Sequence, residues 1–259
     1  MTKTILYFSP TGNVRYVAQS LADALHMGKD VPIAIEKTPY EKLGGNEHLI
    51  ILFSIHGFNP PRTVKRFIKE MPEGLCDSIS LLAVGCAEAW VNEAVNTDLR
   101  KFLESKGYQI LIDRVLAMPL TLVSAFSLET GSELIVAMRE KIDIIAEEIE
   151  SLTVMKPKIR RRSKLIHTFG KVEDPASRLF GLELHTSDAC IHCDLCIKEC
   201  PEKNIHYNRK ERPVFGLRCI MCLRCVYSCP VKAISPRIAK FIPIKGGYSL
   251  TRYLLASRR

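Results

Sequence analysis

Eight of the ten cysteines lie between Cys190 and Cys229, and they form a motif that occurs twice. In each copy, three cysteines are separated by two residues, and a fourth follows after three more residues and is itself followed by proline. The second copy repeats the first at an offset of 29 residues (219 − 190 = 29) at all four cysteines. Repetition at a fixed offset indicates internal duplication, so this part of the chain is predicted to be a small module of two similar halves.

Three cysteines at this spacing can hold three corners of one [4Fe-4S] cube, and the fourth, next to proline, reaches the other cube. The two ligand sets are therefore expected to be crossed. One cluster is predicted to use Cys190, Cys193, Cys196 and Cys229, and the other Cys219, Cys222, Cys225 and Cys200. Zinc is the alternative, but zinc sites typically pair two Cys-x-x-Cys knuckles and need neither a third cysteine at this spacing nor a Cys-Pro.

Length and composition describe a protein of two domains in a reducing compartment. The 259 residues exceed what one such module needs. No apolar run approaches the roughly 18 residues that span a bilayer, and the N-terminal sequence MTKTILYFSPTGN lacks the features of a signal peptide. Cysteines crowded in this way in the cytosol favour metal ligation over disulfides. We therefore expect a cytoplasmic protein without a membrane span.

The first part of the chain alternates short apolar runs with amphipathic stretches, which is typical of strands joined by crossover helices over a parallel sheet. Five strands are expected, at Ile5–Phe8, Pro32–Glu36, Leu49–Ser54, Ile79–Gly85 and Gln109–Ala117. Helices are expected at 14–25, 62–71, 95–107 and 132–152, where apolar residues recur every three or four positions. The pattern predicts an α/β domain with a doubly wound, five-stranded parallel sheet.

Changes in composition divide the chain into four parts. Residues 1–155 form the α/β domain, and residues 156–181 are interpreted as a linker because charge density rises and apolar periodicity stops. A small α+β cysteine domain covers 182–236, and 237–259 is a tail packed on one of the domains. The basic run Lys156–Lys164 is interpreted as a solvated tether, with a docking patch for an acidic redox partner as the alternative.

The loop after the first expected strand carries small hydroxyl, amide and glycine residues and leads directly into the first helix. These residues are Ser9, Thr11, Gly12, Asn13 and Val14. The segment resembles the phosphate loop of flavodoxins, in which such residues surround a phosphate at a helix N-terminus. The resemblance implies bound FMN. The alternative is an ordinary strand-to-helix turn capped by Thr11 or Asn13.

In flavodoxin-like folds the ligand lies beyond the C-terminal ends of the strands, where the strand order reverses. The loops after the third and fourth strands, 54–60 and 85–92, are therefore expected to hold the flavin ring. Phe58 and Trp90 offer aromatic faces for stacking there, or serve as packing or interface residues. Cys76 and Cys86 are expected to be small buried residues.

Together, the phosphate loop and the paired cysteine motifs resemble the flavodoxin–ferredoxin fusion family of anaerobic bacteria and archaea. The resemblance implies a flavodoxin-like domain followed by a bacterial-type ferredoxin domain with two [4Fe-4S] clusters, and electron transfer between FMN and the clusters. The alternative is a ferredoxin-type carrier whose first domain has lost FMN and docks a partner. No catalytic residues for a substrate are evident, so an oxidoreductase activity stays open.

The formal net charge of +9 identifies no partner. Thiolate-ligated clusters and a flavin phosphate are anionic, and part of the basic excess offsets them. A redox partner protein or reductase is expected from the cofactors. No nucleic-acid partner is expected, because only the charge would argue for one.

Overall fold

The structure is a computed structural model, and it describes residues 2–28, 32–87, 90–155 and 157–257. The chain separates into two compact units. Unit 1 comprises residues 1–119, 127–171 and 250–259, and unit 2 comprises residues 120–126 and 172–249. Both units are therefore assembled from segments that are distant in the sequence.

Unit 1 contains a five-stranded parallel sheet with the order β2-β1-β3-β4-β5. The strands are β1 (Lys3–Phe8), β2 (Ile33–Ala34), β3 (His48–Ser54), β4 (Ser78–Gly85) and β5 (Gln109–Ala117). This is the flavodoxin-like strand order, with the reversal at β1 and β3. The predicted fold class is confirmed. The central strand β3 is buried along almost its whole length, as expected for a parallel strand covered on both faces.

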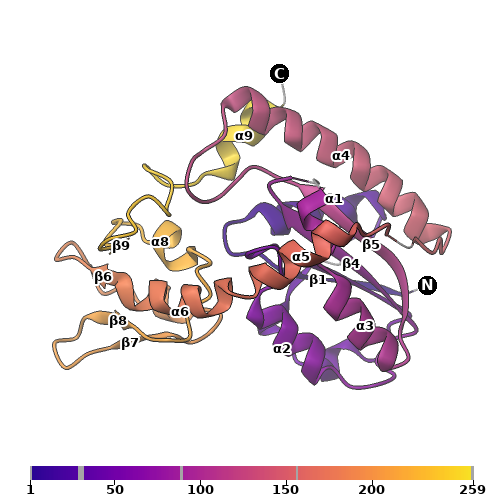
Figure 1. Cartoon of the computed structure of the whole chain (residues 1–259), viewed down its shortest axis with the longest axis horizontal. Helices are drawn as coiled ribbons and strands as arrows, with labels where there is room; N and C mark the ends of the chain where they lie inside the picture. The colour runs from indigo at the N-terminus through magenta and orange to yellow at the C-terminus, as the bar shows by residue number, and fades with distance from the viewer. Residues whose placement is uncertain (1, 29–31, 88–89, 156, 258–259) are drawn as a thin grey trace. The chain divides into compact units, whose positions relative to one another are not determined.

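Helices cover both faces of the sheet (Figure 1). They are α1 (Asn13–Ala24), α2 (Arg62–Glu70), α3 (Thr97–Ser105) and α4 (Leu128–Glu150). In Figure 1, α1 and α4 lie on one side of the strands, and α2 and α3 lie on the other. Gly107 follows α3 at a positive φ of 86°, which is the backbone conformation that ends helices at glycine.

The second strand is much shorter than the sequence predicts. Only Ile33 and Ala34 pair with β1, and the chain then turns into a 3₁₀ helix at Ile35–Lys37. A second 3₁₀ helix follows at Tyr40–Leu43. Edge strands have a partner on one side only, so the local apolar pattern at 32–36 did not determine how far pairing extends.

The expected linker contains two helices, α5 (Arg161–Gly170) and α6 (Glu173–Glu183). Helix α5 belongs to unit 1 and α6 to unit 2, and the division falls between Lys171 and Val172. The basic run is therefore helical from Arg161 onward, whereas Lys156 lies outside the described residues. Short helices without a wide apolar stripe depend on tertiary contacts, which explains why periodicity did not reveal them.

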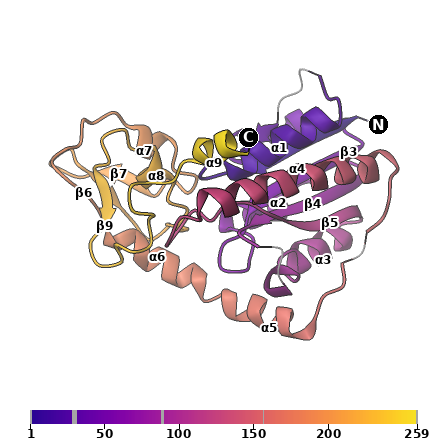
Figure 2. The same cartoon turned by 90° about the horizontal axis from the view of Figure 1, so that it is seen from above.

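The expected tail is divided between the units. Residues 237–249 belong to unit 2, and helix α9 (Leu250–Ala256) belongs to unit 1 and lies along α4 (Figure 2). The Tyr253 ring of α9 is buried directly over Gly131 of α4, where a Cβ would lie 2.2 Å from the ring. Gly131 thus leaves the space that lets α9 pack. Within the described ranges, no helix is long and apolar enough to cross a bilayer.

The part of unit 2 that carries the cysteines is built from two copies of one arrangement, and its strands and short helices recur at the 29-residue offset of the cysteines. Strand β6 (Leu184–Thr186) recurs as β8 (Pro213–Phe215), and β7 (Ile205–Tyr207) recurs as β9 (Ile234–Pro236). The helices α7 (Leu195–Lys198) and α8 (Arg224–Ser228) correspond in the same way. Strand β6 pairs with β9, and β7 pairs with β8, so each antiparallel sheet takes one strand from each copy.

The backbone torsions of unit 2 show the same repeat. Left-handed residues occur in corresponding pairs, His192 with Met221, Asp194 with Leu223, and Lys203 with Lys232. Positive φ is uncommon for residues other than glycine, so three pairs at one offset indicate that the two cysteine loops have the same fold. The duplication is therefore evident in the backbone conformation as well as in the cysteine motif.

Candidate iron–sulfur and flavin sites

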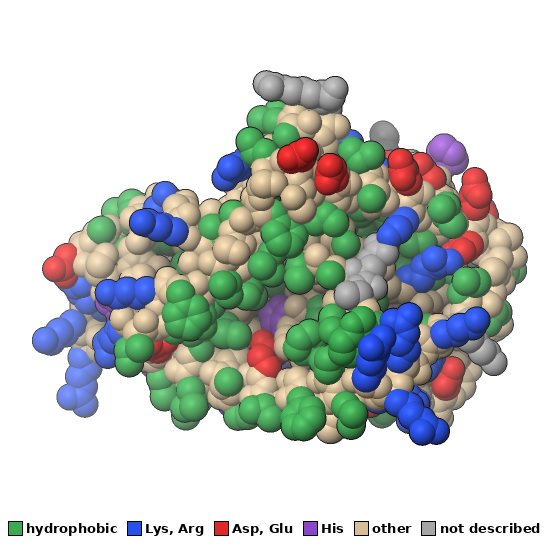
Figure 3. All heavy atoms as spheres, turned by 45° about the horizontal axis from the view of Figure 1, so that its top comes forward, with side chains coloured by type: hydrophobic (Ala, Val, Ile, Leu, Met, Phe, Trp, Pro, Cys, Tyr) green, Lys and Arg blue, Asp and Glu red, His purple; other side chains and the backbone are tan. Residues whose placement is uncertain are grey.

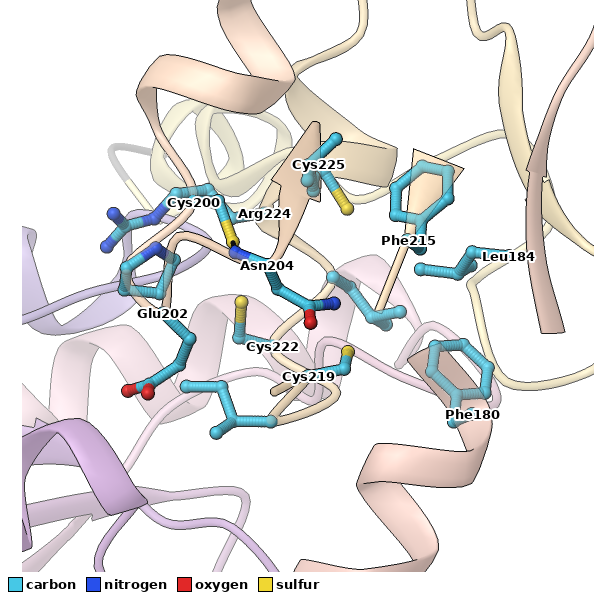
Figure 4. A pocket seen from close by; sticks show the side chains of 14 residues that line it. Phe180, Leu184, Cys200, Glu202, Asn204, Phe215, Cys219, Cys222, Arg224 and Cys225 are labelled. Atoms are coloured by element: carbon cyan, nitrogen blue, oxygen red, sulfur yellow. Dashed lines mark hydrogen bonds between the residues drawn. The ribbon is translucent and has the colours of Figure 1, made fainter. Parts of the chain in front are cut away.

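The structure brings the eight cysteines together as two groups of four, each lining its own cavity. The first cavity is lined by Cys200, Cys219, Cys222 and Cys225. The second is lined by Cys190, Cys193, Cys196 and Cys229. Each group combines three cysteines of one motif with the Cys-Pro cysteine of the other. Figure 4 shows the sulfur atoms of the first group around their cavity.

Backbone N–H groups donate to cysteine sulfur atoms in both halves. The Asn204 N–H donates to Cys200 Sγ at 3.3 Å, and its counterpart, the Ala233 N–H, donates to Cys229 Sγ at 3.2 Å. A third bond joins the Met221 N–H to Cys219 Sγ at 3.3 Å. Such bonds stabilise thiolate and tune the potential of a bound cluster. The turn after each Cys-Pro thus provides the same donor to each crossing cysteine.

The four cysteines of the first cavity are half-buried. Burial raises the pKa of Cys222 to about 12 and raises that of Cys225 well above its usual value. Cluster ligands must be thiolates, so cluster assembly at this cavity has to displace protons that the buried thiols would otherwise keep.

The second cavity carries polar groups at its rim. Tyr207 and Asp194 both line it, and the Tyr207 hydroxyl donates a hydrogen bond to the Asp194 carboxylate. This bond is the main reason that the pKa of Tyr207 rises to about 12. The residues that correspond to Asp194 and Tyr207 in the other half are Leu223 and Pro236, so the two cavities differ in polarity although their backbones match.

Helix α6 closes the first cavity, and sequence reasoning missed this role. Phe180 lines the cavity, and the Ser177 hydroxyl donates to the Cys219 carbonyl at 3.2 Å. Gly181 lies against the Cys219 side chain. In the sequence, the neighbouring Phe180 and Gly181 suggest a close packing contact, but this pair does not by itself identify the cysteine loop as the partner.

The predicted phosphate loop lies between β1 and α1. The Ser9 hydroxyl accepts a hydrogen bond from the Arg15 N–H at 3.0 Å, and Gly12 adopts a left-handed φ of 98° immediately before the helix. A Cβ at Gly12 would meet nothing within 4 Å. Thr11 is half-buried, and Val14 is buried in the core. The loop therefore leaves open space directly at the N-terminus of α1.

The Asn13 side chain points back into unit 1, where its Nδ2 donates to the Pro119 carbonyl at 2.8 Å. Asn13 is buried, so this bond fixes the start of α1 against the segment that follows β5. The structure therefore gives the Asn13 amide an architectural contact in addition to its place in the phosphate loop.

The two expected ring loops follow β3 and β4. Phe58 is partly exposed and has a left-handed φ of 62°, and His56 forms an isolated bridge with Asn59. The guanidinium of Arg162 lies over the Trp90 ring, 4.4 Å from its centroid. Two residues of the second loop, Glu88 and Ala89, lie outside the described residues.

The expectation for the two remaining cysteines is half correct. Cys76 is buried, and burial raises its pKa to about 11. Cys86 is exposed, contrary to prediction, because it stands one residue beyond the end of β4, where the chain leaves the sheet.

Helix α5 packs on both ring loops within unit 1. The Asn59 side chain donates to the His167 carbonyl at 3.0 Å, and the Ala94 N–H donates to the Ser163 hydroxyl at 2.9 Å. Both Ser163 and His167 are buried. At Gly170 a Cβ would lie 1.9 Å from the Gly57 carbonyl oxygen, so only glycine permits this approach. A helix that the sequence did not predict thus packs against the loops that were expected to hold the ring.

Comparison with known proteins bears on the two units separately. Residues 183–230 match the family described as the 4Fe-4S dicluster domain. A search of the curated proteins found no match to the sequence.

Several solved structures resemble the N-terminal part of the chain. One is a flavodoxin from the domain Archaea, at 12% identity and a TM-score of 0.41, with 58% of this chain and 99% of that one covered. An oxidoreductase from Corynebacterium diphtheriae has 14% identity and a TM-score of 0.43, covering 60% and 98%. Rubredoxin oxygen:oxidoreductase from Desulfovibrio gigas has 12% identity and a TM-score of 0.38, covering 56% and 36%.

The fold of unit 1 is established by its own strand order, which is flavodoxin-like. The organisation predicted from the sequence is therefore confirmed. Residues 183–230 match the 4Fe-4S dicluster domain, and unit 1 has the flavodoxin-like strand order, so the chain joins a flavodoxin-like unit to a domain of this family.

Proposed function

We propose that this chain passes electrons between FMN, held at the phosphate loop of unit 1, and two [4Fe-4S] clusters held by the crossed cysteine sets of unit 2. The observation that carries the proposal is the division of eight cysteines into two cavities of four, each with one cysteine from the opposite motif. A redox partner protein in the cytosol supplies or accepts the electrons.

FMN exchanges one or two electrons, whereas each cluster exchanges one, so the pair of clusters matches the capacity of the flavin. The chain itself holds and tunes these groups. Sulfur atoms of Cys200 and Cys229 accept backbone hydrogen bonds that favour the thiolate form. The apolar core of unit 2, which includes Leu184, Ile205 and Ile234, keeps water from the cavities.

The N-terminus of α1 fits a phosphate group. The backbone N–H groups of a first helical turn and the helix dipole favour an anion there. Gly12 leaves the approach open, and the preceding residue, the half-buried Thr11, carries a hydroxyl that can act as a donor. These features support binding of the FMN phosphate by the residues named from the sequence, Ser9, Thr11, Gly12, Asn13 and Val14. Phe58 and Trp90 remain the candidates for contact with the ring.

A second candidate function is a ferredoxin-type carrier in which unit 1 binds no flavin and docks a partner. The observation that favours it is the packing of α5 on both ring loops, with Arg162 covering one face of Trp90. The two candidate functions differ in whether FMN binds at the phosphate loop and against the other face of Trp90.

Replacing Thr11 tests the flavin proposal. Thr11→Asp removes a hydroxyl donor and adds a carboxylate beside a dianion. A charge-assisted hydrogen bond contributes roughly 1.5 to 3 kcal/mol, so FMN affinity is expected to fall by about tenfold to a hundredfold or more. The measurement is an anaerobic titration with FMN of protein freed of flavin.

Thr251→Asp, at an exposed position of α9, is the control for an added charge in unit 1. Iron and sulfide contents should be unchanged in both variants, because the cysteines lie in unit 2. Equal FMN affinity in wild type and Thr11→Asp would place the phosphate elsewhere. Absence of FMN binding by the wild type would favour the carrier without flavin.

A further inference from the structure

The last part of the chain contains no acidic residue. After Glu211 there is neither aspartate nor glutamate, whereas lysine and arginine recur to the C-terminus. Three of these cations, Arg237, Lys240 and Lys245, fall within nine residues of unit 2 together with two exposed large apolar residues, Ile238 and Phe241. We call the segment Arg237–Lys245 the Phe241 loop.

The Phe241 loop is held firmly at its base. Its first N–H, from Arg237, donates to the Glu183 carbonyl at 3.2 Å. The N–H groups of Ile238 and Ala239 both donate to Glu183 Oε1, at 2.7 and 2.6 Å. The only carboxylate bonded to the loop in the described structure therefore lies beneath it and is occupied by backbone donors. A loop fixed in this way has a defined outer surface.

That outer surface is apolar at its centre and cationic around it. Ile238 is 87% exposed and Phe241 is 68% exposed, although burial of large apolar side chains is normally favourable. The cations Arg237, Lys240 and Lys245 are exposed beside them. In Figure 3, blue cationic and green hydrophobic side chains stand next to one another on the part of the surface that belongs to unit 2.

A strained residue extends the apolar centre. Val123 has a φ of 67°, which is a genuine outlier for a β-branched side chain, and it is exposed. Its N–H donates to the Ile242 carbonyl at 2.7 Å, which places it beside the Phe241 loop. Backbone strain of this kind is unfavourable and tends to occur at functional positions. It holds a third apolar side chain on the same surface.

The loop is also attached to the cluster-binding helix α8. The Ile244 N–H donates to the Tyr227 hydroxyl at 2.9 Å, and that hydroxyl donates to the Thr121 carbonyl at 2.7 Å. Tyr227 stands between Cys225, which lines the first cavity, and Cys229, which lines the second. A molecule seated on the loop would therefore be linked through Tyr227 to the helix whose flanking cysteines line both cavities.

We propose that the Phe241 loop, together with Val123, is the docking surface for an acidic electron-carrier protein that exchanges electrons with the clusters. An apolar centre with a charged rim is the usual anatomy of a protein interface, and the cationic rim selects a partner with a negative face. The closeness of the loop to both cysteine sets favours a redox protein over a membrane surface. The inference rests on the proposed function, because it needs clusters that exchange electrons.

The test uses the full chain with its clusters and a purified, strongly acidic flavodoxin, fully reduced, as the electron donor. The second-order rate constant of cluster reduction is measured at several salt concentrations. Lys240→Glu should lower it about threefold to tenfold at low salt, and the difference should vanish at high salt, where rim charges are screened. Lys240→Gln should give a smaller loss. Phe241→Ser should lower it at every salt concentration.

Matched controls lie elsewhere in unit 2. Lys210→Glu changes the same charge on the turn between β7 and β8, and Leu217→Ser removes a comparably exposed apolar side chain. Both should leave the rate constant near the wild-type value. Equal effects of test and control variants, or a wild-type rate that does not depend on salt, would overturn the proposal.

A membrane is distinguished by co-sedimentation with phosphatidylserine vesicles. Binding of the wild type that Phe241→Ser abolishes, with an unchanged rate of reduction by the flavodoxin, would reject the docking proposal in favour of a lipid surface. Iron and sulfide contents distinguish a failure of the proposed function from a failure of the docking proposal. Absent clusters would contradict the proposed function, whereas intact clusters with indifferent rates would contradict the docking proposal alone.

Discussion

Gly181 of helix α6 packs directly against Cys219, one of the four cysteines that line the first cavity. A Cβ added at Gly181 would lie 2.4 Å from the Cys219 Cβ and 2.7 Å from the Gly216 carbonyl oxygen. No flexible side-chain end can move aside there, because one obstacle is a Cβ and the other is backbone. Helix α6 therefore approaches the cysteine loop only because residue 181 is glycine.

Gly181→Ala is expected to displace α6 or the Cys219 loop, at a cost of about 1 to 3 kcal/mol for overpacking. The cluster proposed for Cys200, Cys219, Cys222 and Cys225 should be lost or become labile, so that iron content falls from about eight toward about four per chain. Gly44→Ala, at an open position of unit 1, is the control. Full iron content in Gly181→Ala would show that α6 does not support the cavity.

The crossed ligand sets predict opposite effects for two equivalent cysteines. Cys200→Ser should damage the cluster held with Cys219, Cys222 and Cys225, and Cys229→Ser should damage the other. Electron paramagnetic resonance of the reduced variants distinguishes the remaining cluster in each case. If each substitution damaged the cluster of its own motif, crossing would be wrong.

His48 predicts how the stability of unit 1 depends on pH. It is fully buried between Ser78 and Ser80, and burial lowers its pKa to about 4. The unfolded chain, with a pKa near 6.5, binds more protons between these values, so stability is complete above about 6.5 and falls as the pH is lowered. The free energy of unfolding should decrease by about 2 kcal/mol from pH 7 to pH 5.

Urea unfolding followed by the fluorescence of Trp90, the only tryptophan, measures this change in unit 1. His48→Gln can keep hydrogen bonds to the two serines without a titrating group, so its stability should depend less on pH over this range. Equal dependence in the two proteins would assign the effect to other groups.

Features encoded locally were predictable from the sequence. The strand at Gln109–Ala117 has the predicted bounds, because isoleucine, leucine and valine predominate in it although Asp113 and Arg114 interrupt the apolar run. The grouping of the cysteines into two sets of four could be predicted from their spacing and the offset of 29, because the two copies of a duplicated motif are expected to fold alike. In both cases the determining residues are neighbours in the sequence.

Features that depend on distant contacts were not predictable. Helix α5 is stabilised by Ser163 and His167, whose partners Ala94 and Asn59 are far away in the chain. Residues 120–126 follow a strand of unit 1 yet belong to unit 2, where Tyr227 binds the Thr121 carbonyl. No local sequence pattern indicates such pairings. Neither the packing of α5 against the two ring loops nor the position of Val123 beside the Phe241 loop could therefore be inferred.

An anaerobic cofactor inventory of the purified chain tests the central claim most directly. Iron, acid-labile sulfide, zinc and acid-released flavin are measured on the same preparation after incubation with FMN and removal of the excess. The account predicts about eight iron, about eight sulfide and about one FMN per chain, with no stoichiometric zinc. Stoichiometric zinc without sulfide would contradict the cluster assignment, and full clusters without flavin would contradict electron transfer between FMN and the clusters.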